Sequence, residues 1–158
     1  MDERARGSRW HFSPAATLRE ARAQYFLRAG FGESSYRERW VVLRVRGFPI
    51  FAFLNTAQRV RSVRLHDLHH ALTGYPTTWT GEAEIGAWEL ASGCANHWAA
   101  WVLNFWAALI GLTFTPRRVV AAFRRGRRER NLYDKEFCDA LLDETIAGAR
   151  ARLGIGAA

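Results

Sequence analysis

The chain has 158 residues, 49% of them hydrophobic, and a formal net charge of +8. A chain of this length can bury roughly two-thirds of its unfolded surface in one domain, so no disulfide framework is required. Cys94 and Cys138 lack the spacing of a zinc finger or a Cys-x-x-Cys motif, and the first six residues lack the apolar segment of a secretory signal. We therefore expect a cytoplasmic protein with reduced thiols.

The amino-terminal part is predicted to hold a flexible arm over residues 1–12, followed by a single domain over residues 13–158. Ser13 and Pro14 are typical of a helix cap and first turn, and the helix is expected to end at about Ala29, just before Gly30. Its apolar residues recur at helical spacing.

The next segment alternates apolar residues with arginine, and this pattern predicts a small β-hairpin near residues 40–54. Asn55 is the predicted N-cap of a helix over residues 56–73, with Gln58 as its capping-box partner. Gly74 is expected to end that helix and Pro76 to prevent its continuation.

Four further helical segments follow. A helix is expected to open near Gly81 and run to Ser92, and residues 96–114 form the most apolar stretch of the chain. Thr115 and Pro116 predict the start of a helix that ends at Gly126. An amphipathic helix is expected from Asp134 to about Leu153. The sequence thus predicts a mainly α fold, a single-domain helical bundle with a small β-hairpin.

The apolar segment 96–114 admits three interpretations. It is slightly shorter than the roughly 20 residues that a bilayer-spanning helix needs, and its tryptophans are scattered instead of grouped at its ends. The alternatives to a span are a buried core helix and a helix that faces a lipid-like ligand or the membrane surface. The predicted lipid-binding residues are Trp98, Trp101, Phe105 and Trp106.

Basic residues gather directly after this segment, where seven arginines fall between Arg117 and Arg130. Basic residues beside an apolar segment suit the negative surface of a bilayer, whereas nucleic-acid modules bring a recognisable reading motif that this chain lacks. A peripheral position on the membrane surface is therefore expected, and nucleic acid is not. Solvated helix faces are the other explanation of these arginines.

The candidate site is His66-Asp67-Leu68-His69-His70 together with Glu82. On a helix His66, Asp67 and His70 project from one side, and Glu82 arrives from the next helix after the turn. Two imidazoles and two carboxylates make a ligand set suited to a divalent metal ion. His66, Asp67, His70 and Glu82 are therefore the predicted metal ligands and catalytic residues; an ordinary pair of solvated histidines is the competing explanation.

Two neighbouring side chains are predicted to support these ligands without binding the ion. Glu89 shares a helical face with Glu82 and can accept a hydrogen bond from an imidazole, although it can equally pair with an arginine. His69 points about 100° away from His70 on the helix, so a second-shell or surface position is expected for it.

This constellation closely resembles the signature of the ubiquinone (coenzyme Q) biosynthesis protein 4 family. The resemblance lies in His66-Asp67-x-x-His70, eleven intervening residues and Glu82, with Gly74-Tyr75-Pro76-Thr77 between them. It continues through Trp88 and Glu89 and returns in Asn131-Leu132-Tyr133 and Arg152-Leu153-Gly154-Ile155, covering roughly residues 36–155. The chain is shorter than many members, and its 40–54 region has no clear counterpart in them.

The resemblance implies a largely helical protein, peripherally associated with the inner face of a membrane. It implies a divalent metal ion, with zinc as the expected metal, held by His66, Asp67, His70 and Glu82. It further implies a lyase that removes the C1 carboxyl group of a polyprenylated 4-hydroxybenzoate ring, with coupled hydroxylation at that carbon. Other quinone-biosynthesis proteins are the expected partners, and the apolar content is compatible with a homodimer.

Three alternatives remain open. A zinc hydrolase is one, although an aspartate in place of glutamate reaches less far as a general base. A metal phosphohydrolase needs an upstream histidine, for which His11 is the only candidate. A non-catalytic prenyl-lipid-binding scaffold of a quinone-biosynthesis complex is the third.

Overall fold

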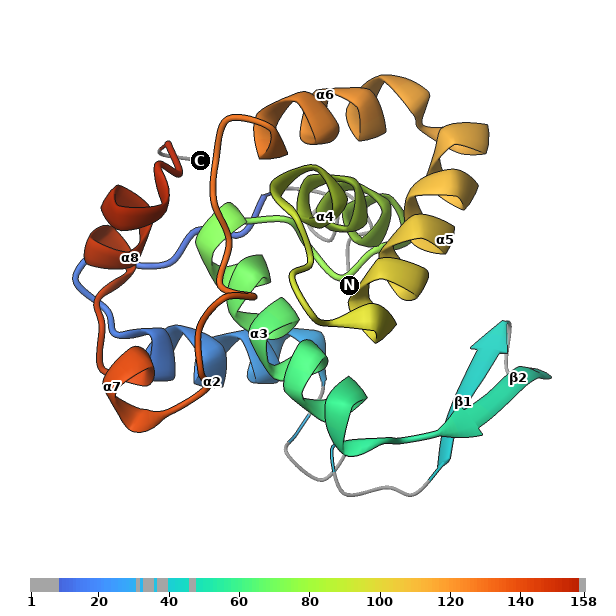
Figure 1. Cartoon of the computed structure of the whole chain (residues 1–158), viewed down its shortest axis with the longest axis horizontal. Coiled ribbons are helices and arrows are strands. Elements are labelled where there is room, and N and C mark those ends of the chain that lie inside the picture. Colours follow the sequence, from blue (N-terminus) through green and yellow to red (C-terminus); the bar gives the residue numbers. More distant parts are fainter. Residues whose placement is uncertain (1–8, 31, 33–35, 37–39, 46–47, 157–158) are drawn as a thin grey trace.

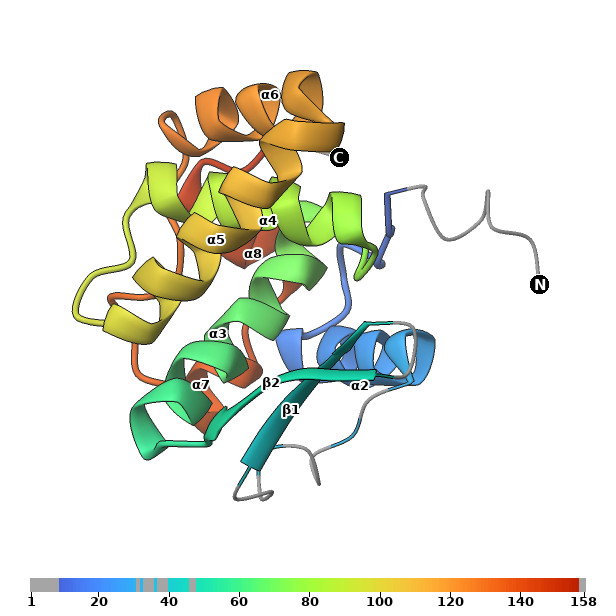
Figure 2. The ribbon, with the colours of Figure 1, turned by 90° about the vertical axis from the view of Figure 1, so that its right-hand side faces the viewer.

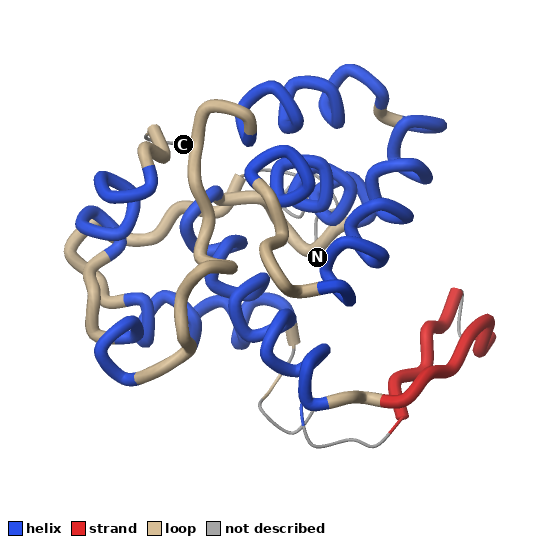
Figure 3. Tube along the Cα trace, in the orientation of Figure 1, coloured by secondary structure: helices blue, strands red, loops and turns tan. Residues whose placement is uncertain are grey.

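The computed structural model describes residues 9–30, 32, 36, 40–45 and 48–156. Within these ranges the chain forms seven helices, so the prediction of a mainly α protein is confirmed (Figure 3). The helices are α2 (Leu18–Ala29), α3 (Ala57–Thr73), α4 (Trp79–Ser92), α5 (Trp98–Phe114), α6 (Pro116–Gly126), α7 (Asp139–Leu142) and α8 (Ile146–Leu153).

Two strands occupy the range in which the sequence predicts a hairpin. Strand β1 (Trp40–Val45) pairs antiparallel with β2 (Phe48–Leu54), with Trp40 opposite Leu54, and the register shifts between Leu43 and Arg44. Residues 46 and 47, which would form the turn, lie outside the described residues. The hairpin as a whole therefore stays a prediction.

The first helix begins later than predicted. Its N-cap is Thr17, whose hydroxyl accepts a hydrogen bond from the backbone N–H of Glu20, while the Glu20 carboxylate accepts from the backbone N–H of Thr17. This reciprocal capping box outcompetes Ser13 and Pro14, which lie in a preceding turn. The predicted end at Ala29 is confirmed, with Gly30 left-handed at φ 72°.

The described end of the predicted amino-terminal arm, residues 9–12, contacts the rest of the chain. Residues 1–8 lie outside the described residues, but Trp10 donates its backbone N–H to the carbonyl of Gly74 at 2.7 Å and Phe12 is buried. Arg9 also donates to the carbonyl of Thr73 at 3.3 Å. This short segment is therefore fastened to the end of α3.

The cap of α3 lies one residue after the predicted one, and α4 begins two residues before its predicted start near Gly81. Thr56, not Asn55, caps α3 and accepts from the N–H of Arg59, and Gly74 ends the helix in the left-handed conformation as predicted. Helix α4 opens at Trp79 behind the cap Thr78. Gly81 lies inside α4, where a Cβ atom would come within 1.9 Å of the Pro76 carbonyl oxygen, so its lack of a side chain permits a close turn.

Helix α5 packs on α4 through its small residues. A Cβ atom on Gly111 would lie 2.2 Å from the Cβ of Ala83, and one on Gly86 would lie 3.1 Å from the carbonyl oxygen of Asn104. Such close approach leaves no room for large side chains between the two helices. The buried residues of α5 are accordingly Ala99, Ala100, Asn104, Ala108 and Gly111.

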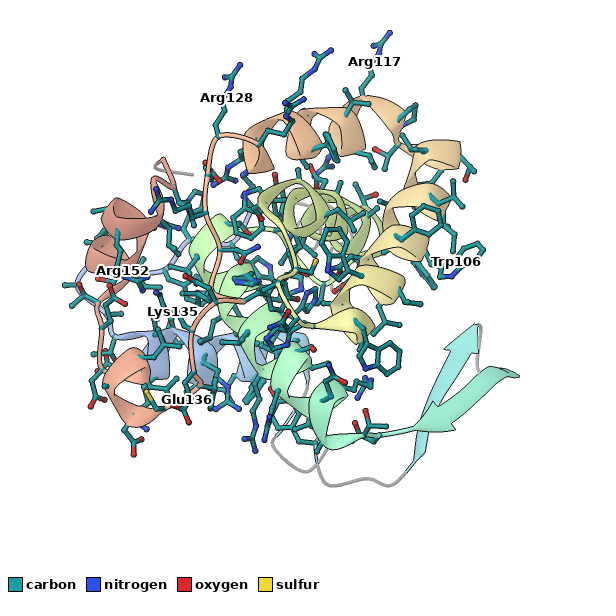
Figure 4. All side chains as sticks on the ribbon, in the orientation of Figure 1. Trp106, Arg117, Arg128, Lys135, Glu136 and Arg152 are labelled. Carbon is teal, nitrogen blue, oxygen red and sulfur yellow. The ribbon has the colours of Figure 1, made fainter. Side chains whose placement is uncertain are left out.

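The large apolar residues of α5 point outward instead. Trp98 is 56% exposed and Trp106 is 55% exposed, and Figure 4 shows Trp106 projecting away from the helix on its outer side. The interpretation of 96–114 as an ordinary buried core helix is therefore incorrect. In the part of the chain that the structure describes, no helix is long and apolar enough to cross a membrane.

The carboxy-terminal region follows the prediction only in part. Helix α6 runs from Pro116 to Gly126 as predicted, but the single helix expected from Asp134 to Leu153 is divided into α7 and α8. Thr145, which lies within the predicted helix, instead caps α8 by accepting from the N–H of Gly148. An isolated antiparallel β-bridge between Thr145 and Thr17 also keeps the backbone at Thr145 extended.

The helices surround α3 and α4. Figures 1 and 2 place α6 at one end of the molecule and α2 and α7 at the opposite end, with α3 and α4 between them. Buried apolar residues from Phe12 to Ile155 form one cluster that includes Leu68, Trp88 and Leu132. This arrangement brings the histidine-bearing half of α3 against the first turns of α4.

Candidate metal centre

Three predicted ligands converge between α3 and α4. The Nε2 atoms of His66 and His70 lie 3.1 Å apart. The Glu82 carboxylate lies across from them, with Oε2 at 3.5 Å from His66 Nε2 and Oε1 at 3.4 Å from His70 Nε2. Candidate ligand atoms of these three residues all lie within 4.8 Å of one another, so the group could hold a metal ion.

Hydrogen bonds from the Nδ1 atoms of both histidines orient the rings so that each Nε2 atom faces the site. His70 Nδ1 donates to the backbone carbonyl of Tyr75 at 2.7 Å, and His66 Nδ1 donates to the Glu89 carboxylate at 2.9 Å. In the neutral imidazoles both Nε2 atoms then carry lone pairs, and these two acceptors face each other. Such an arrangement needs a proton or a cation between the two nitrogens.

The spacing fits a metal ion. Two nitrogens bound tetrahedrally to zinc at about 2.0–2.1 Å would lie about 3.3 Å apart, close to the separation between the two Nε2 atoms. The facing atoms of Glu82 are also acceptors, which is what a cation requires. Side-chain exposure of 20% at His66 and 38% at Glu82, against 0% at His70, leaves one side of the group open to solvent.

The electrostatics of the three ligands match this description. Burial alone would raise the pKa of Glu82, but His70 and His66 hold it well below its usual value. Burial alone would lower the pKa of His66, yet Glu89 and Glu82 raise it well above its ordinary value. The group therefore holds positive charge strongly, as a proton or as a metal ion.

Glu89 is the polar centre beneath the ligands. Its carboxylate is fully buried and accepts from His66, from His69 Nδ1 at 2.6 Å, from the Tyr133 hydroxyl at 2.8 Å and from the Asn104 amide. Burial would raise its pKa, but His66 and the other donors keep the pKa well below its usual value. Glu89 is thus an ionised support for His66, and no arginine among the described residues pairs with it.

His69 occupies an inner position and not the surface. It is fully buried, and its Nε2 accepts the backbone N–H of Leu132 at 2.9 Å while its Nδ1 donates to Glu89. Burial lowers its pKa. A neutral His69 therefore joins α3 to α4 and to the segment after α6, and its contact with the site runs through Glu89.

Asp67 does not join the three ligands. Its Oδ1 accepts from the Tyr25 hydroxyl at 3.0 Å, and its Oδ2 accepts from the Tyr36 hydroxyl. Burial raises the pKa of Asp67, and the opposing effects of His66 and the two hydroxyls are smaller. The expected set of four ligands is therefore corrected to three, because the tyrosines hold this carboxylate on the α2 side of α3.

This position of Asp67 also bears on the hydrolase alternatives. A zincin-like general base would have to face the metal, whereas both Asp67 oxygens are engaged by tyrosine hydroxyls. His11, the upstream histidine of the phosphohydrolase alternative, is exposed. Neither residue adds to the group of three ligands in the described part of the chain.

Several site-supporting residues escaped the sequence analysis. Tyr25 stacks on the His70 ring, with centroids 5.3 Å apart and planes at 23°. Tyr36, Tyr133 and Asn104 complete the hydrogen bonds to Asp67 and Glu89. Two of them carried a sequence signal: Asn104 is a lone polar residue in an apolar segment, and Tyr133 lies in a segment that carries the family resemblance. Tyr25 and Tyr36 look like ordinary core residues.

The predicted lipid-binding residues lie on the outer face of α5. Trp101, Phe105 and Trp106, together with Leu90 and Val102, line a shallow apolar groove with a volume of about 360 Å³. Trp98 is tied by its indole N–H to the side chain of Gln58. The groove is thus distinct from the ligand group, which lies on the α3 side of α4.

Comparisons of the chain with protein-family models, with curated protein sequences and with solved structures found no match. The features that bear on function are the ligand group, the buried network beneath it and the apolar outer face.

Proposed function

We propose that this protein is a metal-dependent lyase of ubiquinone biosynthesis that removes the C1 carboxyl group from a polyprenylated 4-hydroxybenzoate. The observation that carries the proposal is the 3.1 Å approach of the His66 and His70 Nε2 atoms beside Glu82, with both Nδ1 atoms already used as donors. Zinc is the proposed ion, since two imidazoles and a carboxylate with an open position are typical of catalytic zinc sites.

The chain's own residues would orient the ligands. Glu89 fixes the ring of His66, and the Tyr75 carbonyl fixes the ring of His70, so both Nε2 atoms are held ready. When bound, a divalent ion would supply positive charge for the substrate carboxylate or phenolate. The half-exposed Glu82 marks the side from which the ring would enter.

The proposed reaction balances as a simple decarboxylation. A proton from solvent would first add to C1, where the para hydroxyl group donates electron density. The bond between C1 and the carboxylate would then break, carbon dioxide would leave, and the electron pair of that bond would restore the aromatic ring. The coupled hydroxylation would in addition require an oxidant such as dioxygen, and the residues described here address the decarboxylation.

The polyprenyl tail is assigned to the outer face of α5. Trp98, Trp101, Phe105 and Trp106 form an exposed apolar surface, and the arginines of α6 follow it directly in the chain. This combination suits peripheral attachment to the anionic inner face of a membrane from the cytoplasm. Other quinone-biosynthesis proteins and a second copy of the chain are the proposed protein partners.

A non-catalytic prenyl-lipid scaffold is the second candidate, and the same outer face favours it. The groove lined by Trp101 and Phe105 does not include any of the three ligands. Lipid binding that survives complete removal of the metal, with no decarboxylation, would select the scaffold.

The deciding experiment begins with metal content, measured by elemental mass spectrometry on the purified chain. Near-stoichiometric zinc or another divalent ion is expected, with loss in His66→Ala and Glu82→Ala and retention in His11→Ala, which removes an exposed histidine. The second step follows release of labelled carbon dioxide from a carboxyl-labelled prenylated 4-hydroxybenzoate. Absence of metal in the native chain after reconstitution would refute the lyase, as would metal loading without carbon dioxide release.

A further inference from the structure

A second pocket lies where the end of α6 meets the end of α8. It has a volume of about 480 Å³ and is lined by Ala121, Arg124, Arg125, Arg128, Glu129 and Gly154. A volume of this size falls within the range of ligand-binding sites. Three guanidinium groups against one carboxylate make it strongly basic, and none of its residues belongs to the ligand group.

One arginine of this pocket is held rigidly. Arg125 donates from Nε to Glu129 Oε1 at 2.9 Å and from Nη1 to the Thr73 carbonyl at 3.2 Å. Glu129 is in turn engaged by the indole N–H of Trp88 at 2.7 Å. The single carboxylate of the pocket is therefore committed to structural contacts, while Arg125 retains unused donors on its guanidinium.

Two other arginines have no such role. Among the described residues, neither Arg124 nor Arg128 has an ion pair or a side-chain hydrogen bond, and both are exposed. Figure 4 shows Arg128 extending away from the helices. In contrast, Arg118 on the same helix makes a two-point contact with the buried Glu84, at 3.0 and 2.7 Å. Arg118 is thus paired with a nearby carboxylate, whereas Glu129 is already engaged by Arg125 and Trp88.

A fourth guanidinium adds buried charge beside the pocket. Arg150 donates from Nε to the Leu72 carbonyl at 2.8 Å, but its Nη2 is buried without a hydrogen-bond partner in the described structure. Burial lowers the pKa of Arg150, and the charge of Arg125 lowers it further. Concentrating positive charge beside this pocket therefore costs folding free energy.

The excess charge corresponds to that of a phosphate monoester. Arg124, Arg125, Arg128 and Arg150 face one carboxylate, which leaves three positive charges uncompensated. The carboxy-terminal ends of α6 and α8 offset about one of these, since each helix end carries about half a negative charge. About two remain, and a phosphate monoester carries roughly −1.5 to −2 at neutral pH.

We propose that this pocket binds the phosphate monoester group of an anionic ligand, with Arg124 and Arg128 closing on a group that the fixed Arg125 positions. Guanidinium groups match phosphate oxygens with paired hydrogen bonds, which makes arginine well suited to this role. The phosphate belongs either to a lipid headgroup at the membrane or to a soluble phosphate ester. The site is independent of the proposed lyase activity.

Calorimetric titration of the whole chain with inorganic phosphate tests the proposal. Saturable binding is expected, and the double variant R124Q/R128Q is expected to weaken it at least about tenfold. The matched control is R117Q/R127Q, which removes two exposed arginines from the same region but none that lines the pocket. The control and His66→Ala are expected to bind phosphate as the wild type does, and circular dichroism checks the fold of each variant.

Vesicles distinguish the two sources of phosphate. Phosphatidylcholine vesicles carrying phosphatidic acid, a monoester, are compared with vesicles carrying phosphatidylglycerol, a diester. A preference for phosphatidic acid that R124Q/R128Q abolishes identifies a lipid headgroup; saturable binding of inorganic phosphate without that preference identifies a soluble ester. An equal loss in both double variants indicates diffuse attraction and overturns the proposal, as does the absence of saturable binding to either probe.

Discussion

The interface of α3 with α4 and the outer face of α5 distribute polarity in opposite ways. Between α3 and α4 lie fully buried His69, His70 and Glu89, whereas tryptophans on α5 are about half exposed. Soluble domains usually expose charged residues and bury most of the surface of their tryptophans. Buried charge is costly unless it is paired, and exposed apolar patches mark interaction surfaces. This reversal is what the proposed metal site and the proposed membrane contact would both require.

Breaking the buried network should have the largest effect on stability. Glu89→Ala leaves four donors without their acceptor, from His66, His69, Tyr133 and Asn104. We expect a loss of about 3–5 kcal/mol in the free energy of unfolding, measured by denaturant titration. Glu136→Ala, which removes an exposed carboxylate, should change it by less than about 0.5 kcal/mol. Similar values for the two variants would contradict a structural role for Glu89.

The close approach of α5 to α4 is the next feature to test. Gly111→Ala places a Cβ atom 2.2 Å from that of Ala83, so the helices must separate. We expect a loss of about 1–3 kcal/mol, again by denaturant titration. Gly156→Ala is the control, because nothing lies within 4 Å of its added Cβ. A Gly111→Ala variant as stable as the wild type would show that the small residues do not determine how α5 packs.

A variant of Asp67 tests whether this residue binds the metal or only supports the site. Asp67→Asn preserves the shape but weakens the hydrogen bonds from Tyr25 and Tyr36, so a stability loss of about 1–2 kcal/mol is expected with the metal retained. Asp134→Asn, at an exposed position, should leave both stability and metal unchanged. Metal loss in Asp67→Asn as complete as in His66→Ala would restore the four-ligand set that the sequence alone predicts.

Substitutions on the outer face of α5 should change the free energy of unfolding least and membrane association most. Trp106 is 55% exposed, so Trp106→Ser should cost less than about 1 kcal/mol in the free energy of unfolding. Sedimentation with anionic vesicles should nevertheless detect weaker association. Trp79→Ser removes a tryptophan of α4 that is 67% exposed, and it should leave vesicle association unchanged. If Trp106→Ser and Trp79→Ser bind vesicles equally well, the outer face of α5 does not contact the membrane.

The sequence predicts the ligand group well because helical periodicity is local. His66 and His70 four residues apart must share a helical face, and the turn at Gly74 with Pro76 brings the chain back so that Glu82 can meet them. Glu89 follows from the same periodicity on α4. The helix ends at Gly30 and Gly74 can likewise be read from the sequence, because a left-handed glycine acts over one turn.

The remaining features depend on contacts between segments far apart in the chain. Asp67 is adjacent to His66 in sequence, yet Tyr25 from α2 and Tyr36 engage its carboxylate, and no local pattern indicates those partners. Helix α5 was readable as apolar, but which side it buries was decided by Gly111, Gly86 and Ala83, whose small size permits close packing that turns the tryptophans outward. Local hydrogen bonding and periodicity thus determined the elements and the ligands, whereas packing between helices decided which polar groups are buried and which apolar ones are not.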